Sequence, residues 1–132
     1  CQRQTGSTSV VNAFYETERF TLLSGGLSVH VVQTGSGKPH EIHRCQRCGT
    51  ALFSHYPRLG ALGMGLRVGT LDDPGALSPD AVIFAAYKMP WVGLPAGIPV
   101  FEETYNPVEL LPPERLARLK ALSEKARQLQ KS

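Results

Sequence analysis

Two cysteines separated by two residues, Cys45 and Cys48, constrain the fold of this chain more than any other feature of its sequence. Gly49 follows the second cysteine, and the flanking segments 40–44 and 50–56 have the composition of extended strands. Two thiolates at this spacing across a tight turn can bind one tetrahedral Zn²⁺. A glycine suits the positive φ that such a turn often requires. The pattern therefore favours a strand–knuckle–strand unit that supplies half of a zinc site.

Two other interpretations of the cysteine pair remain open. A redox-active Cys-x-x-Cys requires a strand that runs into a helix, because the helix N-terminus lowers the thiol pKa. Here both flanking segments are expected to be extended, which makes the redox interpretation the weaker one. The third interpretation is a pair of free thiols with a purely structural role.

The other two ligands of a four-coordinate zinc site have to come from elsewhere, because the sequence has no second Cys-x-x-Cys. The candidates within the chain are His40, His43, His55 and Cys1. His43 is the best local choice, because residues two apart on a strand point to the same face and His43 would share a face with Cys45. Alternatively, the missing ligands lie upstream of residue 1, since the chain begins with a cysteine where a start methionine is expected.

The composition limits the class of protein. The chain has 132 residues, the length of a single domain, and only three cysteines. A secreted disulfide scaffold is excluded, because such scaffolds are rich in cysteine and contain it in even numbers. Glycine and proline account for 23 of the 132 residues, above the average of about 12%. This favours short elements joined by many turns over a helical bundle.

Strand signals dominate most of the chain. In the segment 27–32, apolar residues recur at every second position, at Leu27, Val29 and Val31. This period of two places them on one face of a strand. The expected extended segments are 10–15, 18–23, 27–32, 40–44, 50–56, 60–69 and 82–87. The last of these is apolar and is expected to be a buried strand. The glycines of 60–69 predict a bulge or a close backbone approach, and three prolines and two glycines exclude regular structure from 89–99.

A helix is predicted over residues 112–132. Two prolines and a glutamate open it, which suits the first turn and the positive end of the helix dipole. Apolar residues recur on one side at helical spacing: Leu116, Leu119, Leu122, Ala126 and Leu129. We expect this stripe to pack on the rest of the chain or on a second copy in a homodimer, and a partner peptide is the less favoured alternative.

The charge of the chain is concentrated in this helix. Residues 114–132 hold six basic and two acidic residues, whereas the remainder holds eight basic and nine acidic residues. A nucleic-acid surface would require basic residues spread over a folded face, so we expect no nucleic-acid partner. No apolar run approaches the roughly 18 residues of a membrane span, and no signal peptide is visible. We therefore expect no membrane partner and a cytoplasmic location.

Four stretches, taken together and in this order, resemble the glutathione-dependent formaldehyde-activating enzyme family, also called the GFA or centromere-protein-V domain family. They are residues 1–7 (CQRQTGS), 45–53 (CQRCGTALF), 69–74 (GTLDDP) and 89–91 (MPW). The resemblance covers roughly residues 1–101, and the C-terminal helix lies outside it.

The resemblance implies a mainly β fold, with Mss4-like folded β-sheets around a zinc knuckle, followed by the C-terminal helix. The expected domains are residues 1–111, a GFA-like β domain lacking its N-terminal part, and residues 112–132, the amphipathic helix. Family members carry seven metal-binding cysteines. By resemblance, Cys45 and Cys48 belong to a structural Zn²⁺ site that an N-terminal Cys-x-Cys completes.

The resemblance also implies a second, three-thiolate zinc site, of which Cys1 is the last ligand and the catalytic residue. The loop of Thr5, Gly6 and Ser7 would lie beside that metal. Two interpretations of this loop are open: an ordinary turn, which is favoured, and a site whose backbone N–H groups face an anion, such as a substrate carboxylate or a developing alkoxide. The other ligands of both sites are absent from this sequence, and we therefore expect an N-terminally truncated member.

The reaction that the resemblance implies is the addition of the glutathione thiol to formaldehyde, which gives S-hydroxymethylglutathione and belongs with the carbon–sulfur lyases. The expected partner is a small molecule, glutathione or a related thiol adduct. Trp91 is a candidate wall of the substrate pocket, although a core position is favoured for it, and Asp72 and Asp73 are expected to stabilise a turn. The alternative function is a non-catalytic, zinc-ribbon-like binding module whose partner surface is the basic helix.

Overall fold

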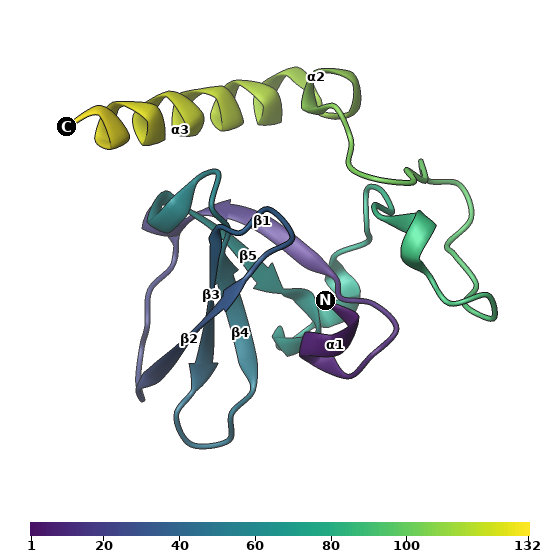
Figure 1. Ribbon diagram of the computed structural model, residues 1–132, viewed down its shortest axis with the longest axis horizontal. Helices are drawn as coiled ribbons and strands as arrows, with labels where there is room; N and C mark the ends of the chain where they lie inside the picture. The colour runs from purple at the N-terminus through teal and green to yellow at the C-terminus, as the bar shows by residue number, and fades with distance from the viewer.

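The centre of the molecule is a five-stranded antiparallel sheet with the strand order β1-β5-β4-β3-β2 (Figure 1). The computed structural model describes residues 1–132. The strands are β1 (Asn12–Glu16), β2 (Leu27–Gln33), β3 (Pro39–Cys45), β4 (Ala51–His55) and β5 (Gly63–Arg67). The strands predicted at 10–15, 27–32, 40–44, 50–56 and 60–69 are confirmed, and so is a mainly β architecture with a C-terminal helix.

The core lies around the two strands β3 and β4. Ile42 of β3 and Ser54 of β4 are paired across the sheet and are both almost completely buried. Phe53 points to the opposite face, where the ring of Phe20 packs against it with a centroid separation of 4.9 Å. Only 12 of the 132 residues are buried, so the hydrophobic core of this chain is small.

Two expected strands are wrong. Residues 18–23 begin within a short 3-10 helix, η1 (Thr17–Arg19), and continue as an irregular segment. Residues 82–87 form one isolated bridge, between Val82 and Val100, and then a 3-10 helix, η5 (Ala85–Tyr87). The reason is the backbone of Phe84, whose φ of 56° lies in the left-handed region and turns the chain out of an extended ladder. Phe84 is also half-exposed, which contradicts the expected burial.

The glycines of β5 make room for neighbouring side chains. A Cβ at Gly65 would lie 3.0 Å from the ring of Tyr56 and 3.4 Å from that of Phe14. The expected close approach is therefore made by two aromatic rings rather than by backbone. The irregularity of the sheet lies elsewhere, at the shift in register between His43 and Arg44 where β3 pairs with β4.

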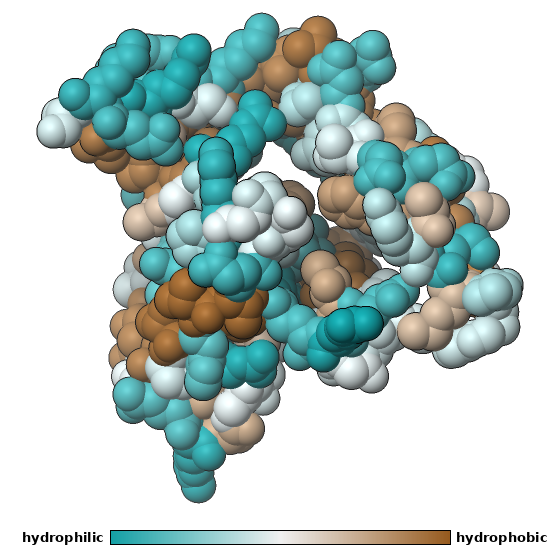
Figure 2. All heavy atoms as spheres, viewed as in Figure 1, coloured by the Kyte–Doolittle hydropathy of each residue, from teal (hydrophilic) through white to brown (hydrophobic).

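Three α-helices complete the structure, and the longest packs on the body as expected. They are α1 (Gln2–Thr5), α2 (Pro107–Leu110) and α3 (Pro113–Lys131). In the predicted stripe of α3, the three leucines nearest its start are half-buried and Ala126 is buried, whereas Leu129 is 59% exposed. Figure 2 shows hydrophilic residues on the outer side of α3 and hydrophobic residues beneath it. None of the helices is both long and apolar enough to cross a membrane.

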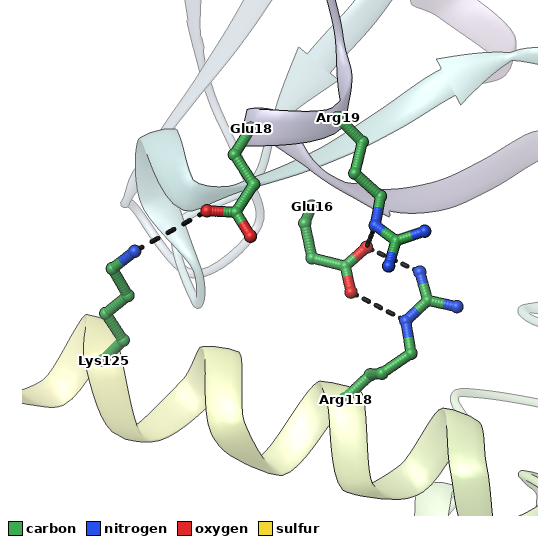
Figure 3. Close-up of polar contacts among 5 residues, drawn as sticks. All are labelled: Glu16, Glu18, Arg19, Arg118 and Lys125. Carbon is green, nitrogen blue, oxygen red and sulfur yellow. Dashed lines mark hydrogen bonds and ion pairs between the residues drawn. The ribbon is translucent and has the colours of Figure 1, made fainter.

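Ion pairs fix α3 to the end of β1 (Figure 3). The guanidinium of Arg118 donates two hydrogen bonds to the Glu16 carboxylate, at 2.8 and 2.6 Å, and Lys125 Nζ lies 3.9 Å from Glu18. The hydrogen bonds from Arg118 lower the pKa of Glu16 to about 2. Arg115 and Arg127 pair with Asp80 and Glu124, so four of the six basic side chains of residues 114–132 have partners within the chain.

The segment between the sheet and α3 lies largely off the body. In Figure 1 residues of this segment run out from the sheet before the chain returns to α2. The accessible surface of the whole chain is 9247 Å², whereas a compact monomer of this mass exposes about 6,800 Å². Within residues 71–112 only Ala85 is buried, so this segment contributes little to a shared core. The division into domains 1–111 and 112–132 stays a prediction.

Candidate metal knuckle and substrate cleft

The connection between β3 and β4 is a tight turn that brings Cys45 and Cys48 to one place. The Cys45 N–H donates to the carbonyl of Thr50, and the Gly49 N–H donates back to the carbonyl of Cys45, both at 2.9 Å. Gly49 has φ 76°, which confirms the expected positive φ at this position. The turn is therefore closed by backbone hydrogen bonds, to which the Arg44 guanidinium adds one to the carbonyl of Gly49 at 3.0 Å.

The two thiols are arranged as a pair. The Cys48 thiol lies 3.1 Å from the Thr50 hydroxyl and is exposed, while Cys45 is half-buried. Hydrogen bonds from the Thr50 hydroxyl, from the Thr50 backbone and from Cys45 lower the pKa of Cys48, in that order of size. A lowered pKa favours the thiolate, the form that binds metals. Two thiols at this spacing can supply two ligands of a tetrahedral zinc site. Both flanks are strands, so the helix that a redox pair requires is not there.

The knuckle is braced against the turn before β2. The Gln46 N–H donates to the carbonyl of Gly26 at 3.1 Å, and its side-chain amide donates to the carbonyl of Leu27 at 3.2 Å. A Cβ at Gly26 would meet the amide end of the Gln46 side chain, so a larger residue here would displace that side chain from its contact. The open cleft beside the knuckle has a volume of about 470 Å³. No further cysteine or histidine lines it.

The histidines do not complete the knuckle site. His43 was the favoured local ligand, but its imidazole groups with Glu41 and His55 instead of with the thiols. His40 stacks on Tyr56 with a centroid separation of 4.3 Å. Burial lowers the pKa of both His40 and His43. The local Cys45/Cys48/His43 zinc site is therefore not assembled in this structure.

A second, separate cleft lies at the N-terminal end of the chain. It has a volume of about 590 Å³ and is lined by Gln2, Arg3, Gly6, Ser7, Thr8, Met89 and Trp91. It brings together Gly6, Ser7 and Trp91, which are far apart in the sequence. Trp91 is 74% exposed, so the favoured core position for it was wrong. The carbonyl of Tyr87 accepts a hydrogen bond from the Gln2 side chain at 2.9 Å, which ties the two sides of the cleft.

The backbone N–H groups of the loop do not face an anion. Those of Thr5 and Gly6 donate to the carbonyls of Cys1 and Gln2, at 2.9 and 2.8 Å. The Ser7 N–H donates to the hydroxyl of Thr5 at 3.2 Å. The loop is therefore the ordinary turn that the sequence favoured, and the alternative anion site of backbone donors is not formed, because the turn uses these N–H groups. Thr5 serves this turn and does not line the cleft.

Four residues of this cleft were not indicated by the sequence: Gln2, Arg3, Thr8 and Met89. Arg3 is the only charged residue in the lining, and its side chain has no ion pair within the chain. The position of Arg3 in the sequence, between Cys1 and the Thr5–Ser7 loop, could have indicated that it lies at the cleft. Asp72 and Asp73 lie in an exposed turn and do not line the cleft.

The knuckle and the cleft lie at opposite ends of β3. Gln4 of α1 lies 3.5 Å from the imidazole of His40, near the start of β3, whereas Cys45 ends that strand. Five residues of extended strand span about 16 Å. Figure 1 shows the turn after β3 away from the N-terminus and α1. Cys1 therefore belongs to a different part of the molecule from Cys45 and Cys48.

Comparison with known proteins gives one result. The family model described as "Glutathione-dependent formaldehyde-activating enzyme" matches residues 1–87, about two thirds of the chain. This range includes Cys1, the Thr5–Ser7 loop and the knuckle. No curated protein and no solved structure matches. The five-stranded sheet agrees with the mainly β, Mss4-like fold expected from the sequence.

Proposed function

The chain belongs to the family of glutathione-dependent formaldehyde-activating enzymes, and from this premise we propose that it acts in zinc-dependent carbon–sulfur chemistry. The proposed substrate is glutathione or a related thiol adduct. In the addition direction, the thiol sulfur forms a bond to the carbon of formaldehyde and the thiol proton ends on the former carbonyl oxygen. The lyase direction breaks the same carbon–sulfur bond and returns both molecules.

One observation carries this proposal: the N-terminal cleft places Gly6 and Ser7 of the family-matched segment beside Trp91. Arg3 offers the cleft a single positive charge. A guanidinium binds a carboxylate through two parallel hydrogen bonds, and a glutathione-like substrate carries carboxylates. The exposed ring of Trp91 offers an apolar wall for the rest of such a substrate. The cleft therefore has the charge and shape for an acidic, flexible thiol.

Zinc fits the residues present only in part. Cys45 and Cys48 would supply two ligands of a structural ion, and Cys1 would supply one ligand of a second ion near the cleft. When bound, a zinc ion with an open position stabilises a thiolate and polarises a carbonyl. The chain's own part in the reaction is to hold the substrate carboxylate with Arg3 and to donate a hydrogen bond from the Ser7 hydroxyl to the oxygen that gains charge. These roles, and the assignment of Thr5 to supporting the loop, are proposals.

A titration of the full chain with glutathione tests the binding part of this proposal. We expect amide shifts at Gly6 and Ser7 and a shift of the Trp91 indole N–H, with no shift at Gly49 in the knuckle, at the opposite end of β3 from the cleft. Arg3→Ala should weaken binding about tenfold, the effect of losing about 1.4 kcal/mol. Arg58→Ala, which removes another exposed arginine outside the cleft, is the matched control. Unchanged amides at millimolar glutathione would count against this substrate class.

The alternative function, a non-catalytic zinc-binding module with the basic helix as its partner surface, has less support. Such a surface needs unpaired basic side chains, and Arg115, Arg118, Lys125 and Arg127 are engaged within the chain. The alternative would gain support if glutathione failed to bind while the helix captured an acidic peptide. A homodimer and a cytoplasmic location stay predictions.

A further inference from the structure

Three potential metal ligands meet on one face of the sheet, apart from all three cysteines. Glu41 and His43 are two residues apart on β3, and His55 of β4 is paired with Glu41. All three side chains therefore point to the same face. One ligand atom from each lies within 4.8 Å of the others. Neither the proposed zinc knuckle nor the N-terminal cleft includes any of them.

The hydrogen bonding of His55 leaves its outer nitrogen free for a cation. Its Nδ1 lies 2.8 Å from the carbonyl oxygen of Gly63. A carbonyl can only accept, so Nδ1 carries the proton and Nε2 carries the lone pair. Histidines that bind metals commonly donate their other ring N–H to a backbone carbonyl in this way, which fixes both tautomer and ring orientation. The scaffold therefore holds His55 in the tautomer that ligation requires.

His43 presents a buried nitrogen that has no partner. Its Nε2 is shielded from solvent and makes no hydrogen bond. The nearest carboxylate oxygen, Oε2 of Glu41, is 3.7 Å away, beyond hydrogen-bond distance. A buried polar atom without a partner is unfavourable. A cation between this nitrogen, Glu41 and His55 would satisfy it.

We propose that Glu41, His43 and His55 form a binding site for a divalent transition-metal ion of the zinc class. Two imidazoles and one carboxylate are a donor set of zinc sites that keep an open position. Imidazole suits zinc and its neighbours, whereas calcium and magnesium prefer oxygen ligands. The Glu41 side chain is 46% exposed, so the fourth position faces solvent and would take a water molecule.

The geometry needs only side-chain adjustment to bind. Two ligands at zinc bond lengths lie about 3.4 Å apart in a tetrahedral site, and the present ligand atoms are within 4.8 Å of one another. Glu41 Oε2 and His43 Nε2 are already 3.7 Å apart, so the remaining adjustment is a side-chain rotation that brings the His55 nitrogen closer to them. β3 and β4 fix the two histidines relative to each other, because their backbones are joined in the centre of the sheet.

A purely structural role for the same residues makes a different prediction. The His43 ring stacks on Phe53 with a centroid separation of 4.4 Å, and the edge of His55 contacts it at 4.8 Å. If packing were their only purpose, replacing His43 by another flat ring would preserve every property of the site. His43→Phe therefore keeps the stack and removes the ligand nitrogen, which separates the two roles.

The experiment measures Zn²⁺ binding in a variant with Cys1, Cys45 and Cys48 all changed to serine. We expect one Zn²⁺ per chain, and a loss of affinity of at least about 100-fold on adding His43→Phe, more than the loss of a supporting residue causes. His30→Phe, at an exposed histidine of β2, is the matched control and should leave affinity unchanged. A folded cysteine-free variant that binds no Zn²⁺, or unchanged affinity after His43→Phe, would overturn the proposal.

A second measurement covers the case in which the cysteine-free variant does not fold. Co²⁺ is added to the unaltered chain, where thiolate ligands give charge-transfer absorption and nitrogen and oxygen ligands do not. We expect additional visible absorption without thiolate character, which His43→Phe abolishes and His30→Phe retains. Identical spectra for the unaltered chain and His43→Phe would refute the site. The outcome is independent of glutathione binding, so it does not decide the proposed function.

Discussion

The cysteine knuckle and the N-terminal cleft are built over very different distances in the sequence. All parts of the knuckle lie between Cys45 and Thr50 and are joined by backbone hydrogen bonds of 2.9 Å. The cleft joins α1 and its following loop to Met89 and Trp91, and the hydrogen bond from Gln2 to Tyr87 is the side-chain link between its two sides. The knuckle is thus held mainly by contacts between near neighbours, with one brace from Gln46 to the turn before β2, whereas the cleft depends on how a long segment is held.

The difference bears on what each region can do. The knuckle hydrogen bonds adjoin the pairing of β3 with β4, so the sheet holds both thiols at one end of these strands. One wall of the cleft belongs to the segment after residue 70, which shares little of the small core. Ligand binding at the cleft should therefore order that wall at a cost in conformational entropy. We expect zinc affinity at the knuckle to depend on its ligand atoms. We expect glutathione affinity at the cleft to depend on the contacts that hold its two sides together.

The largest expected effect is at the knuckle. Changing Cys45 and Cys48 to serine removes both thiolates, and zinc affinity at this site should fall at least about 100-fold, beyond the effect of losing a supporting residue. Competition with a chromophoric chelator measures this affinity. Glutathione binding at the cleft should not change, because the two regions lie at opposite ends of β3. A loss of glutathione affinity at the cleft together with the loss of zinc affinity at the knuckle would contradict the separation of the two regions.

The next effect is at the cleft. Trp91→Ala removes the apolar wall and should lower glutathione affinity about tenfold, or about 1.4 kcal/mol. Isothermal titration with glutathione measures it, and zinc binding at the knuckle serves as the internal reference. Phe84→Ala, at another half-exposed aromatic residue outside the cleft, is the matched control. A Trp91→Ala protein that binds glutathione as well as Phe84→Ala does would remove Trp91 from the site.

A smaller effect tests the rigidity of the knuckle itself. Gly49→Ala forces a residue with a side chain into the left-handed region, at a cost of about 1–2 kcal/mol in the free energy of unfolding. Urea denaturation measures this cost. Gly35→Ala is the control, since Gly35 has no positive φ and open space around its Cβ position. Equal stabilities of the two variants would show that the turn adapts and is not fixed by its backbone.

The smallest effect concerns the anchor of α3, which should leave both sites unchanged. Glu16 has a pKa of about 2, below its ordinary value of 4.5, so its ion pair with Arg118 stabilises the fold fully above about pH 4.5. That contribution is lost as the pH falls towards 2, because the carboxylate becomes protonated. Glu16→Gln should cost about 0.5–1 kcal/mol at pH 7 and flatten this acid dependence, as measured by urea denaturation across pH. A Glu16→Gln protein that keeps the original acid dependence would assign it to other groups.

Local patterns made the sheet and the knuckle predictable. The alternation of Leu27, Val29 and Val31 marked β2, and the spacing of Cys45 and Cys48 before Gly49 marked the turn. In contrast, the apolar composition of 82–87 indicated a strand, because nothing in it showed that Phe84 adopts a left-handed backbone.

The candidate sites were predictable only in part, because they depend on contacts that no local pattern records. The resemblance indicated Ser7 and Trp91, but it did not reveal that the turn uses the backbone N–H groups of its own loop. His43 and Cys45 are two residues apart on β3, as the sequence showed. The pairing of β3 with β4 nevertheless brings His43 next to His55, and no local pattern records that pairing. The partner of Glu16 comes from α3, far along the chain, and only tertiary structure shows it.

The central claim, that the N-terminal cleft performs thiol–formaldehyde chemistry, is tested most directly by the rate of exchange between glutathione and S-hydroxymethylglutathione. Nuclear magnetic resonance with ¹³C-labelled formaldehyde measures this rate with the zinc-loaded full chain. The account predicts a rate above that without protein, a reduction of about tenfold in Arg3→Ala, equivalent to about 1.4 kcal/mol, and no reduction in Arg58→Ala. An exchange rate with the unaltered chain equal to the rate without protein would contradict it.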